Sequence, residues 1–137
     1  MLKIIEKVVN SPIRMPAKPG VKLVAGSIGK LVDYEGTQVV DICDGYNAFG
    51  IIGTKRSLKE LSFDREDMVA IWPQRMVFRT DVFDDRSSLE YNGGQSMYVN
   101  SNGLLSPECP WENSLYVAKL ISRITKEDKI YIECLWL

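Results

Sequence analysis

The sequence predicts an all-β protein, an antiparallel barrel or sandwich of short strands with an extended N-terminal arm. Short apolar segments recur about every ten residues, turns with glycine or asparagine separate them, and no segment has the pattern of an ordinary amphipathic helix. The chain has 137 residues, which is enough to bury a core without disulfides or a metal ion. We therefore expect an arm at residues 1–20 and one β-rich domain at residues 21–137.

The expected arm combines apolar side chains with prolines. Residues 2–9 are apolar enough to form a short strand or a helical turn. Pro12, Pro16 and Pro19 follow, and proline fixes φ and lacks a backbone donor, so residues 11–20 should be extended and pair little with the chain's own sheet. A floppy terminus is the alternative interpretation. The apolar side chains that we expect to contact a partner are Ile4, Ile5, Val8, Ile13 and Met15.

The first half of the domain has the pattern of a β-meander. The expected strands are residues 28–34, 37–43 and 48–54. Glu35-Gly36 and Asp44-Gly45 form the turns between them, because glycine at the second turn position supplies the positive φ that a tight hairpin needs. Gly50 and Gly53 inside the third strand indicate a bulge or a close approach of another backbone.

The second half continues the pattern after a polar stretch at residues 55–67, which is a loop or one short helix. The expected strands are residues 68–72, 76–83, 95–100, 104–105, 115–124 and 129–137. In the last strand, Ile130, Ile132, Cys134 and Trp136 share one face by period two. The other face is only half polar, so we expect burial on both sides near the chain end, by a second sheet or a neighbouring subunit.

Catalytic chemistry has little support in the sequence. Histidine is absent, which removes the commonest general base and transition-metal ligand, and no nucleophile-elbow, Walker A or dinucleotide-binding motif occurs. Cys43, Cys109 and Cys134 form no C-x-x-C pair and have no basic sequence neighbour, so we expect reduced, partly buried thiols. The sequence therefore predicts a protein that is not an enzyme and needs no cofactor.

Two acidic clusters have residue types that could bind a cation. They are Asp64, Glu66 and Asp67, and Asp81, Asp84 and Asp85. Hard cations take carboxylate ligands from such loops, but the spacing matches no EF-hand, and Arg65 and Arg86 lie among the acids. Paired-carboxylate glycosidase chemistry would also need a sizeable cleft. We expect solvated loops at both clusters and no metal.

Charge and hydropathy argue against two classes of partner. The formal net charge is −1 and the basic residues are scattered, whereas phosphate recognition needs clustered Lys and Arg, so no nucleic-acid partner is expected. No stretch approaches the roughly 20 apolar residues of a membrane-spanning helix. Charges at Lys3, Glu6 and Lys7 interrupt any signal-peptide core, so we expect synthesis in the cytoplasm and no membrane partner.

The three tryptophans are expected to differ in environment. Trp72 and Trp136 lie in apolar strands and should be core residues. Trp111 lies between Pro110 and Glu112 in an irregular segment and should be exposed. Because aromatic side chains dominate binding hot spots, Trp111 is a further candidate partner-binding residue.

Two pairs of segments carry a family resemblance. The first is G-K-L-V-D-Y-E-G at residues 29–36 with A-F-G-I-I-G at residues 48–53. The second is Q-S-M-Y-V-N-S-N-G-L-L at residues 95–105 with L-Y-V-A-K-L at residues 115–120. This order of turns and strands resembles small β-rich structural proteins of tailed bacteriophages, most of all capsid decoration (cement) proteins.

The resemblance implies a virion protein that is made in the host cytoplasm and binds the outside of the expanded phage head. Its partner would be the major capsid protein, its arm would help to clamp the shell, and it would be a homo-oligomer, either a dimer or a trimer. It implies no catalytic, cofactor or metal residue. Two alternatives stay open: a tail, head–tail or baseplate component, and a β-sandwich carbohydrate-binding module with an aromatic platform around Trp111.

Overall fold

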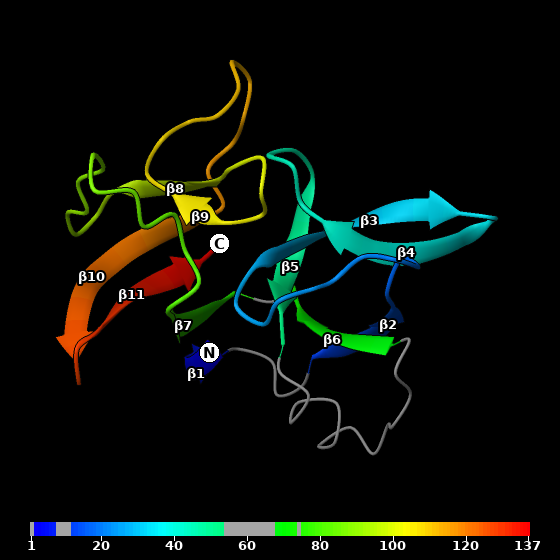
Figure 1. The fold of residues 1–137 in the computed structure, drawn as a ribbon, viewed down its shortest axis with the longest axis horizontal. Coiled ribbons are helices and arrows are strands. Elements are labelled where there is room, and N and C mark those ends of the chain that lie inside the picture. Colours follow the sequence, from blue (N-terminus) through cyan, green and yellow to red (C-terminus); the bar gives the residue numbers. More distant parts are fainter. Residues whose placement is uncertain (1, 8–11, 54–67, 74) are drawn as a thin grey trace.

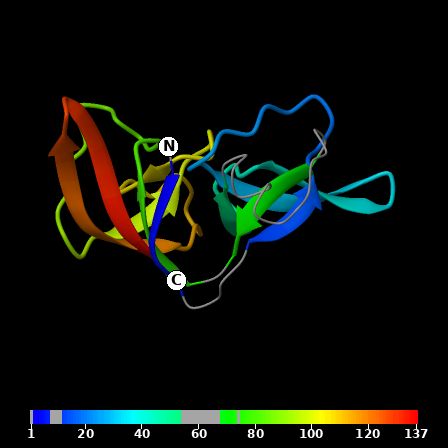
Figure 2. The same cartoon turned by 90° about the horizontal axis from the view of Figure 1, so that it is seen from below.

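The computed structural model describes residues 2–7, 12–53, 68–73 and 75–137, with residues 3–7 as backbone only. Over these residues the protein is all-β, as the sequence predicts, and its strands form two antiparallel sheets. Figures 1 and 2 show the two sheets side by side, with the N- and C-termini near the middle of the molecule. No helix within the described part of the chain is long and apolar enough to span a membrane.

One sheet has six strands. In spatial order they are β1 (Leu2–Lys7), β7 (Met76–Thr80), β11 (Lys129–Trp136), β10 (Ala118–Lys126), β8 (Ser96–Val99) and β9 (Leu105–Ser106). The hairpin of β10 and β11 is the longest in the molecule and turns through Glu127 and Asp128, both with positive φ. β1 and β9 form the two edges of this sheet.

The other sheet has five strands. In spatial order they are β2 (Ile13–Pro16), β6 (Met68–Trp72), β5 (Ala48–Ile52), β3 (Ile28–Tyr34) and β4 (Thr37–Ile42). Just after β2, Ala17 forms a parallel bridge with Val40 of β4, and the backbone N–H of Lys18 donates to the Val40 oxygen at 2.8 Å. These contacts join the first and last strands, so the five-stranded sheet curls back on itself.

The main core lies between the two sheets. On the six-stranded side, alternate residues of β7 and β11 are buried, among them Phe78, Ile132 and Trp136. On the other side, Ile28 and Ile51 join the same cluster. A smaller cluster of buried Val40, Ile52, Val69 and Ile71 fills the curl of the five-stranded sheet. Full burial of such side chains stabilises by about 1.5–3 kcal/mol each.

Several local expectations are confirmed. Trp72 and Trp136 are buried, as predicted for core residues. The predicted turn at Glu35-Gly36 has positive φ at both residues, which is the geometry of a tight hairpin. At Gly50, an added Cβ would lie 2.6 Å from the main-chain oxygen of Trp72, so the predicted close backbone approach occurs between β5 and β6.

The N-terminal segment is not a largely unpaired arm. β1 pairs with β7 and β2 pairs with β6, so the expectation that residues 11–20 pair little with the chain's own sheets is wrong for residues 13–16. The prolines permit this pairing because Pro12 precedes β2 and Pro16 ends it, where a missing donor disturbs the ladder least. Residues 2–16 thus supply one strand to each sheet.

Other expectations also need correction. Ile130 is exposed, because it lies near the tip of the β10–β11 hairpin, beyond the core. On the opposite face, Leu135 is half-buried and Leu137 is exposed, so among the described residues no second sheet covers that face fully. Residues 115–117 precede β10 instead of belonging to it. The polar stretch expected as a loop or helix at residues 55–67 lies outside the described residues.

Candidate functional site

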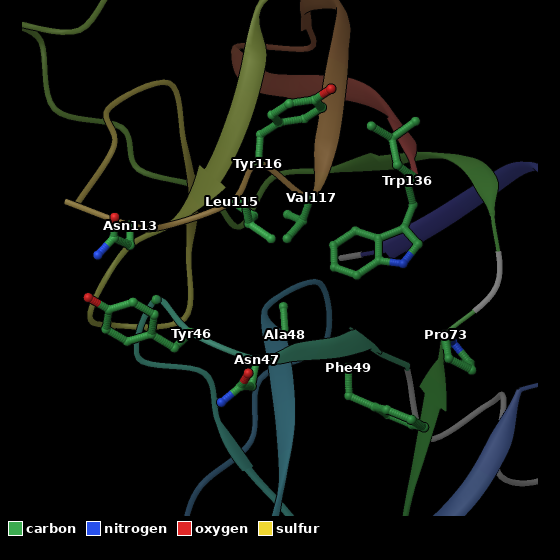
Figure 3. A pocket seen from close by; sticks show the side chains of 12 residues that line it. Tyr46, Asn47, Ala48, Phe49, Pro73, Asn113, Leu115, Tyr116, Val117 and Trp136 are labelled. Atoms are coloured by element: carbon green, nitrogen blue, oxygen red, sulfur yellow. The ribbon is translucent and has the colours of Figure 1, made fainter. Parts of the chain in front are cut away.

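A groove of about 400 Å³ opens between the two sheets, and we call it the inter-sheet groove. It is lined by residues 45–49, 73, 113, 115–117, 136 and 137. Figure 3 shows that these residues come from two sides: residues 46–49 lie just before and at the start of β5, and residues 113 and 115–117 lie in the loop before β10. The volume falls within the range of about 300–1,000 Å³ that is usual for small-ligand sites.

Two hydrogen bonds fix one end of the groove. The indole N–H of Trp111 donates to the main-chain oxygen of Asp44 at 2.8 Å, and the Ser114 hydroxyl donates to the oxygen of Gly45 at 3.4 Å. Gly45 has φ +113°, and an added Cβ would lie 2.3 Å from Nε1 of Trp111. Only glycine therefore fits where the turn after β4 meets the loop before β10.

Aromatic rings lie between these two hydrogen bonds and the mouth of the inter-sheet groove. The rings of Tyr46 and Trp111 are stacked, with centroids 6.1 Å apart and planes inclined by 14°. Trp111 is 42% exposed, which confirms its predicted exposure, although one of its faces is used by Tyr46. Leu115 is 82% exposed and Tyr116 is also exposed, so apolar surface surrounds the mouth of the groove.

The two ends of the groove differ in chemistry. Figure 3 shows Tyr46, Asn47 and Asn113 at one end, with Trp136 and Pro73 at the other. Asn47 adopts φ +56°, a left-handed conformation that asparagine tolerates better than most residues. All the lining side chains are uncharged, so the groove offers amides, phenols and apolar surface without an ion pair.

Charged groups near the groove lie outside its lining. Lys30 forms an ion pair with Asp44 at 3.1 Å, and this contact lowers the pKa of the Asp44 carboxyl. The Lys119 ammonium lies 4.7 Å from the ring centroid of Tyr116 and donates to the Ser96 hydroxyl at 2.9 Å. Both charges are therefore engaged by neighbours within the protein.

The structure places the sequence-predicted partner residues on three separate elements. Ile4 and Ile5 lie in β1, and Val8 lies outside the described residues. Ile13 is 43% exposed in β2, whereas Met15 packs against the smaller core cluster and is half-buried. Trp111 lies on a different element, the loop between β9 and β10.

Sequence reasoning missed most of the groove. Asn47, Asn113 and Leu115 carry no motif, and Leu115 was assigned to a strand because it begins an apolar run. One signal was available: Pro110 and the polar residues up to Ser114 make an irregular loop, and exposed apolar residues at the end of such a loop are candidates for contact. The convergence of this loop on residues 44–47 is a tertiary property.

The acidic loop and the cysteines play structural parts. Asp84 is buried rather than solvated. Arg86 donates two hydrogen bonds to its carboxylate, at 2.9 and 2.7 Å, and these compensate the buried charge. Cys43 and Cys134 are free and buried, and burial raises the pKa of Cys134 to about 12, which keeps that thiol protonated. Cys109 is free but exposed, so the expectation of partial burial is wrong there.

Within the described part of the chain, no group of three or more His, Cys, Asp and Glu is placed to hold a metal ion. The acids Asp64, Glu66 and Asp67 lie outside that part. No protein-family model and no curated protein matches the chain.

Proposed function

We propose that this chain is a non-enzymatic structural protein of a phage virion that attaches to the outside of the capsid and stabilises it. The observation that carries the proposal is the position of β1. It is the terminal strand of the six-stranded sheet, and its outer side pairs with no other strand among the described residues. The major capsid protein attaches along this edge.

An open sheet edge is suited to such attachment. Its unpaired backbone N–H and C=O groups accept a strand from another chain, which gives affinity through main-chain hydrogen bonds. β1 extends over six residues, so the edge is long enough for a segment of a capsid subunit to pair along it. The N-terminal segment thus keeps the partner-binding role expected for Ile4 and Ile5, but as an anchored strand instead of a free arm.

β1 also carries a device that limits unspecific pairing. Its register with β7 shifts between Ile4 and Glu6, so Ile5 has no Cα partner in β7. A bulge of this kind bends and twists an edge strand, and proteins use bulges to prevent edge-to-edge aggregation. The edge therefore favours a partner segment shaped to the bulge over a second flat strand.

The choice of a capsid as partner is supported by the sequence. The order of turns and strands at residues 29–53 and 95–120 resembles that of capsid decoration proteins, and these segments form the hairpin β3–β4 and the strands β5, β8 and β10. A near-neutral net charge suits a surface that must not capture DNA. Modest contacts suffice, because a shell repeats them by symmetry and a bound protein stabilises the state it binds.

The proposal is tested by co-sedimentation of the purified protein with heads of the phage that encodes it. Two samples are compared: expanded heads that lack this protein, and unexpanded proheads. Saturable binding to expanded heads alone, with a higher disruption temperature of the shell, supports capsid attachment. Absence of binding to expanded heads overturns it, and immunogold labelling of intact virions on the tail would then assign the protein to a tail structure.

A further inference from the structure

We propose that the inter-sheet groove binds a neutral saccharide. The groove is independent of the β1 edge: its lining comes from residues 45–49, 73, 113, 115–117, 136 and 137, none of which belongs to β1. The inference therefore adds a ligand site to the proposed capsid attachment and does not depend on it.

The charge of the lining narrows the class of ligand. No Asp, Glu, Lys or Arg side chain lines the groove. Nearby, Lys30 forms an ion pair with Asp44, and Lys119 contacts Tyr116 and Ser96. A phosphate or a nucleotide needs cationic or helix-terminal donors, and a cation needs carboxylates. An uncharged ligand is the class that this lining accepts without an unpaired buried charge.

The polar groups of the groove match a ligand rich in hydroxyls. The amides of Asn47 and Asn113 each offer two donors and an acceptor, and neither side chain has a hydrogen-bond partner among the described residues. Figure 3 places both amides beside the Tyr46 ring. A sugar hydroxyl both donates and accepts, so it can satisfy both sides of such an amide.

The apolar groups of the groove suit the C–H faces of a sugar ring. A pyranose presents C–H groups on its flat faces, and these pack on aromatic rings while the hydroxyls project from its edge. Tyr46 is 44% exposed and contributes aromatic surface at one end of the groove, and the Trp136 ring lies at the other end, where only 3% of that residue is exposed. Asn47 and Asn113 are both exposed to solvent, and a purely apolar ligand would displace water from their amides without replacing its hydrogen bonds.

The groove is also held in shape before any ligand arrives. Trp111 and Ser114 bond the loop before β10 to Asp44 and Gly45, and the Trp111 ring stacks on Tyr46. A preformed site loses less conformational entropy on binding than one that must order a loop. This arrangement favours a short rigid ligand over an extended peptide, which would itself have to be ordered.

The test is titration of the full-length protein with neutral disaccharides: cellobiose, lactose and N,N′-diacetylchitobiose. Calorimetry gives the affinity, and NMR follows the side-chain amide signals of Asn47 and Asn113. Saturable binding of at least one disaccharide, with movement of both amide signals, supports the proposal. A uronate-containing disaccharide of equal size and a capped neutral tetrapeptide are the comparison ligands, and both are expected to bind more weakly.

Two variants locate the binding. Asn113→Ala and Asn47→Gly each remove one amide, and glycine keeps the positive φ at residue 47. Each should weaken the association about fivefold to tenfold, the effect of one lost hydrogen bond. The control is Asn92→Ala, an exposed asparagine in the turn before β8. No binding of any neutral disaccharide, tighter binding of the uronate or the peptide, or unchanged affinity in both variants would overturn the proposal.

Discussion

The indole N–H of Trp111 donates a hydrogen bond of 2.8 Å to the main-chain oxygen of Asp44, which lies 67 residues earlier in the chain. This bond joins the loop before β10 to the turn after β4, so one end of the inter-sheet groove depends on a contact between the two halves of the molecule. The same ring stacks on Tyr46 and covers Gly45. Trp111 therefore holds the loop before β10 against the turn after β4 at this end of the groove.

The first prediction concerns the hydrogen bond between Trp111 and Asp44. Trp111→Phe keeps an aromatic ring but removes the N–H, so it should lower the free energy of unfolding by about 1 kcal/mol, the net value of one hydrogen bond. Urea denaturation at neutral pH measures this change. The amide signal of Asn113 should shift in the same variant, because its loop loses one attachment. An unchanged urea midpoint would contradict this role of Trp111.

The second prediction compares two glycines of positive φ. Gly36 has open space around an added Cβ, whereas at Gly45 the Cβ would meet the Trp111 ring. Gly36→Ala should cost only the left-handed strain of alanine, about 1–2 kcal/mol. Gly45→Ala should cost about 1–3 kcal/mol more, because the indole must also move. Equal melting temperatures of the two variants would show that Trp111 is not held against residue 45.

The third prediction concerns the N-terminal segment. Deletion of residues 1–19 removes one edge strand from each sheet, β1 and β2, and the Ala17–Val40 bridge that closes the five-stranded sheet. It also exposes the core beside Leu2 and Met15. The truncated chain should show no cooperative thermal transition by circular dichroism. A sharp transition near that of the full chain, with well-dispersed NMR signals, would show that the segment is a dispensable arm.

The fourth prediction concerns acid stability. The Arg86 guanidinium hydrogen-bonds the Asp84 carboxylate and thereby lowers the pKa of Asp84 below its ordinary value of 3.8. A carboxyl whose pKa is lower in the folded state contributes stability above the unfolded pKa and loses it as the pH falls through the folded pKa. The wild-type urea midpoint should therefore fall as the pH is lowered below about 4.

Asp84→Asn isolates this contribution. The variant should be less stable than the wild type at neutral pH, and its urea midpoint should fall less as the pH is lowered below about 4, since residue 84 no longer titrates. Asp85→Asn, a change at the exposed neighbouring residue, is the control and should follow the wild-type curve. Parallel acid curves for Asp84→Asn and the wild type would rule out the Asp84–Arg86 pair as a source of acid sensitivity.

Local sequence patterns predicted several strands, because strand propensity and turn residues depend on neighbouring positions in the chain. β3 and β6 begin and end where the sequence predicts, at Ile28–Tyr34 and Met68–Trp72. A glycine turn at Glu35-Gly36 and a proline at Pro73 mark where these strands end. Burial of Trp72 and exposure of Trp111 followed from the apolar or irregular character of their segments.

The pairing of strands was beyond local patterns. β1 and β2 are close in sequence but join different sheets, β1 beside β7 and β2 beside β6, and no periodicity in either strand encodes its neighbour. The groove is a second case. Asn47 and Asn113 are ordinary loop residues in sequence, and both line one groove because the Trp111 hydrogen bond joins their loops. Long-range packing, rather than propensity, decides both features.

The most direct test of capsid attachment is a change at the bulge of β1. Ile5→Lys adds a charge to the edge at the residue without a partner in β7, and lysine on an edge opposes strand addition. Ile121→Lys is the matched control, at the bulge residue of β10, which is 44% exposed. Both variants are first checked by thermal melting and then titrated onto expanded heads. We predict that Ile5→Lys binds at least about tenfold more weakly than the wild type while Ile121→Lys binds normally; wild-type binding by a folded Ile5→Lys would contradict attachment through β1.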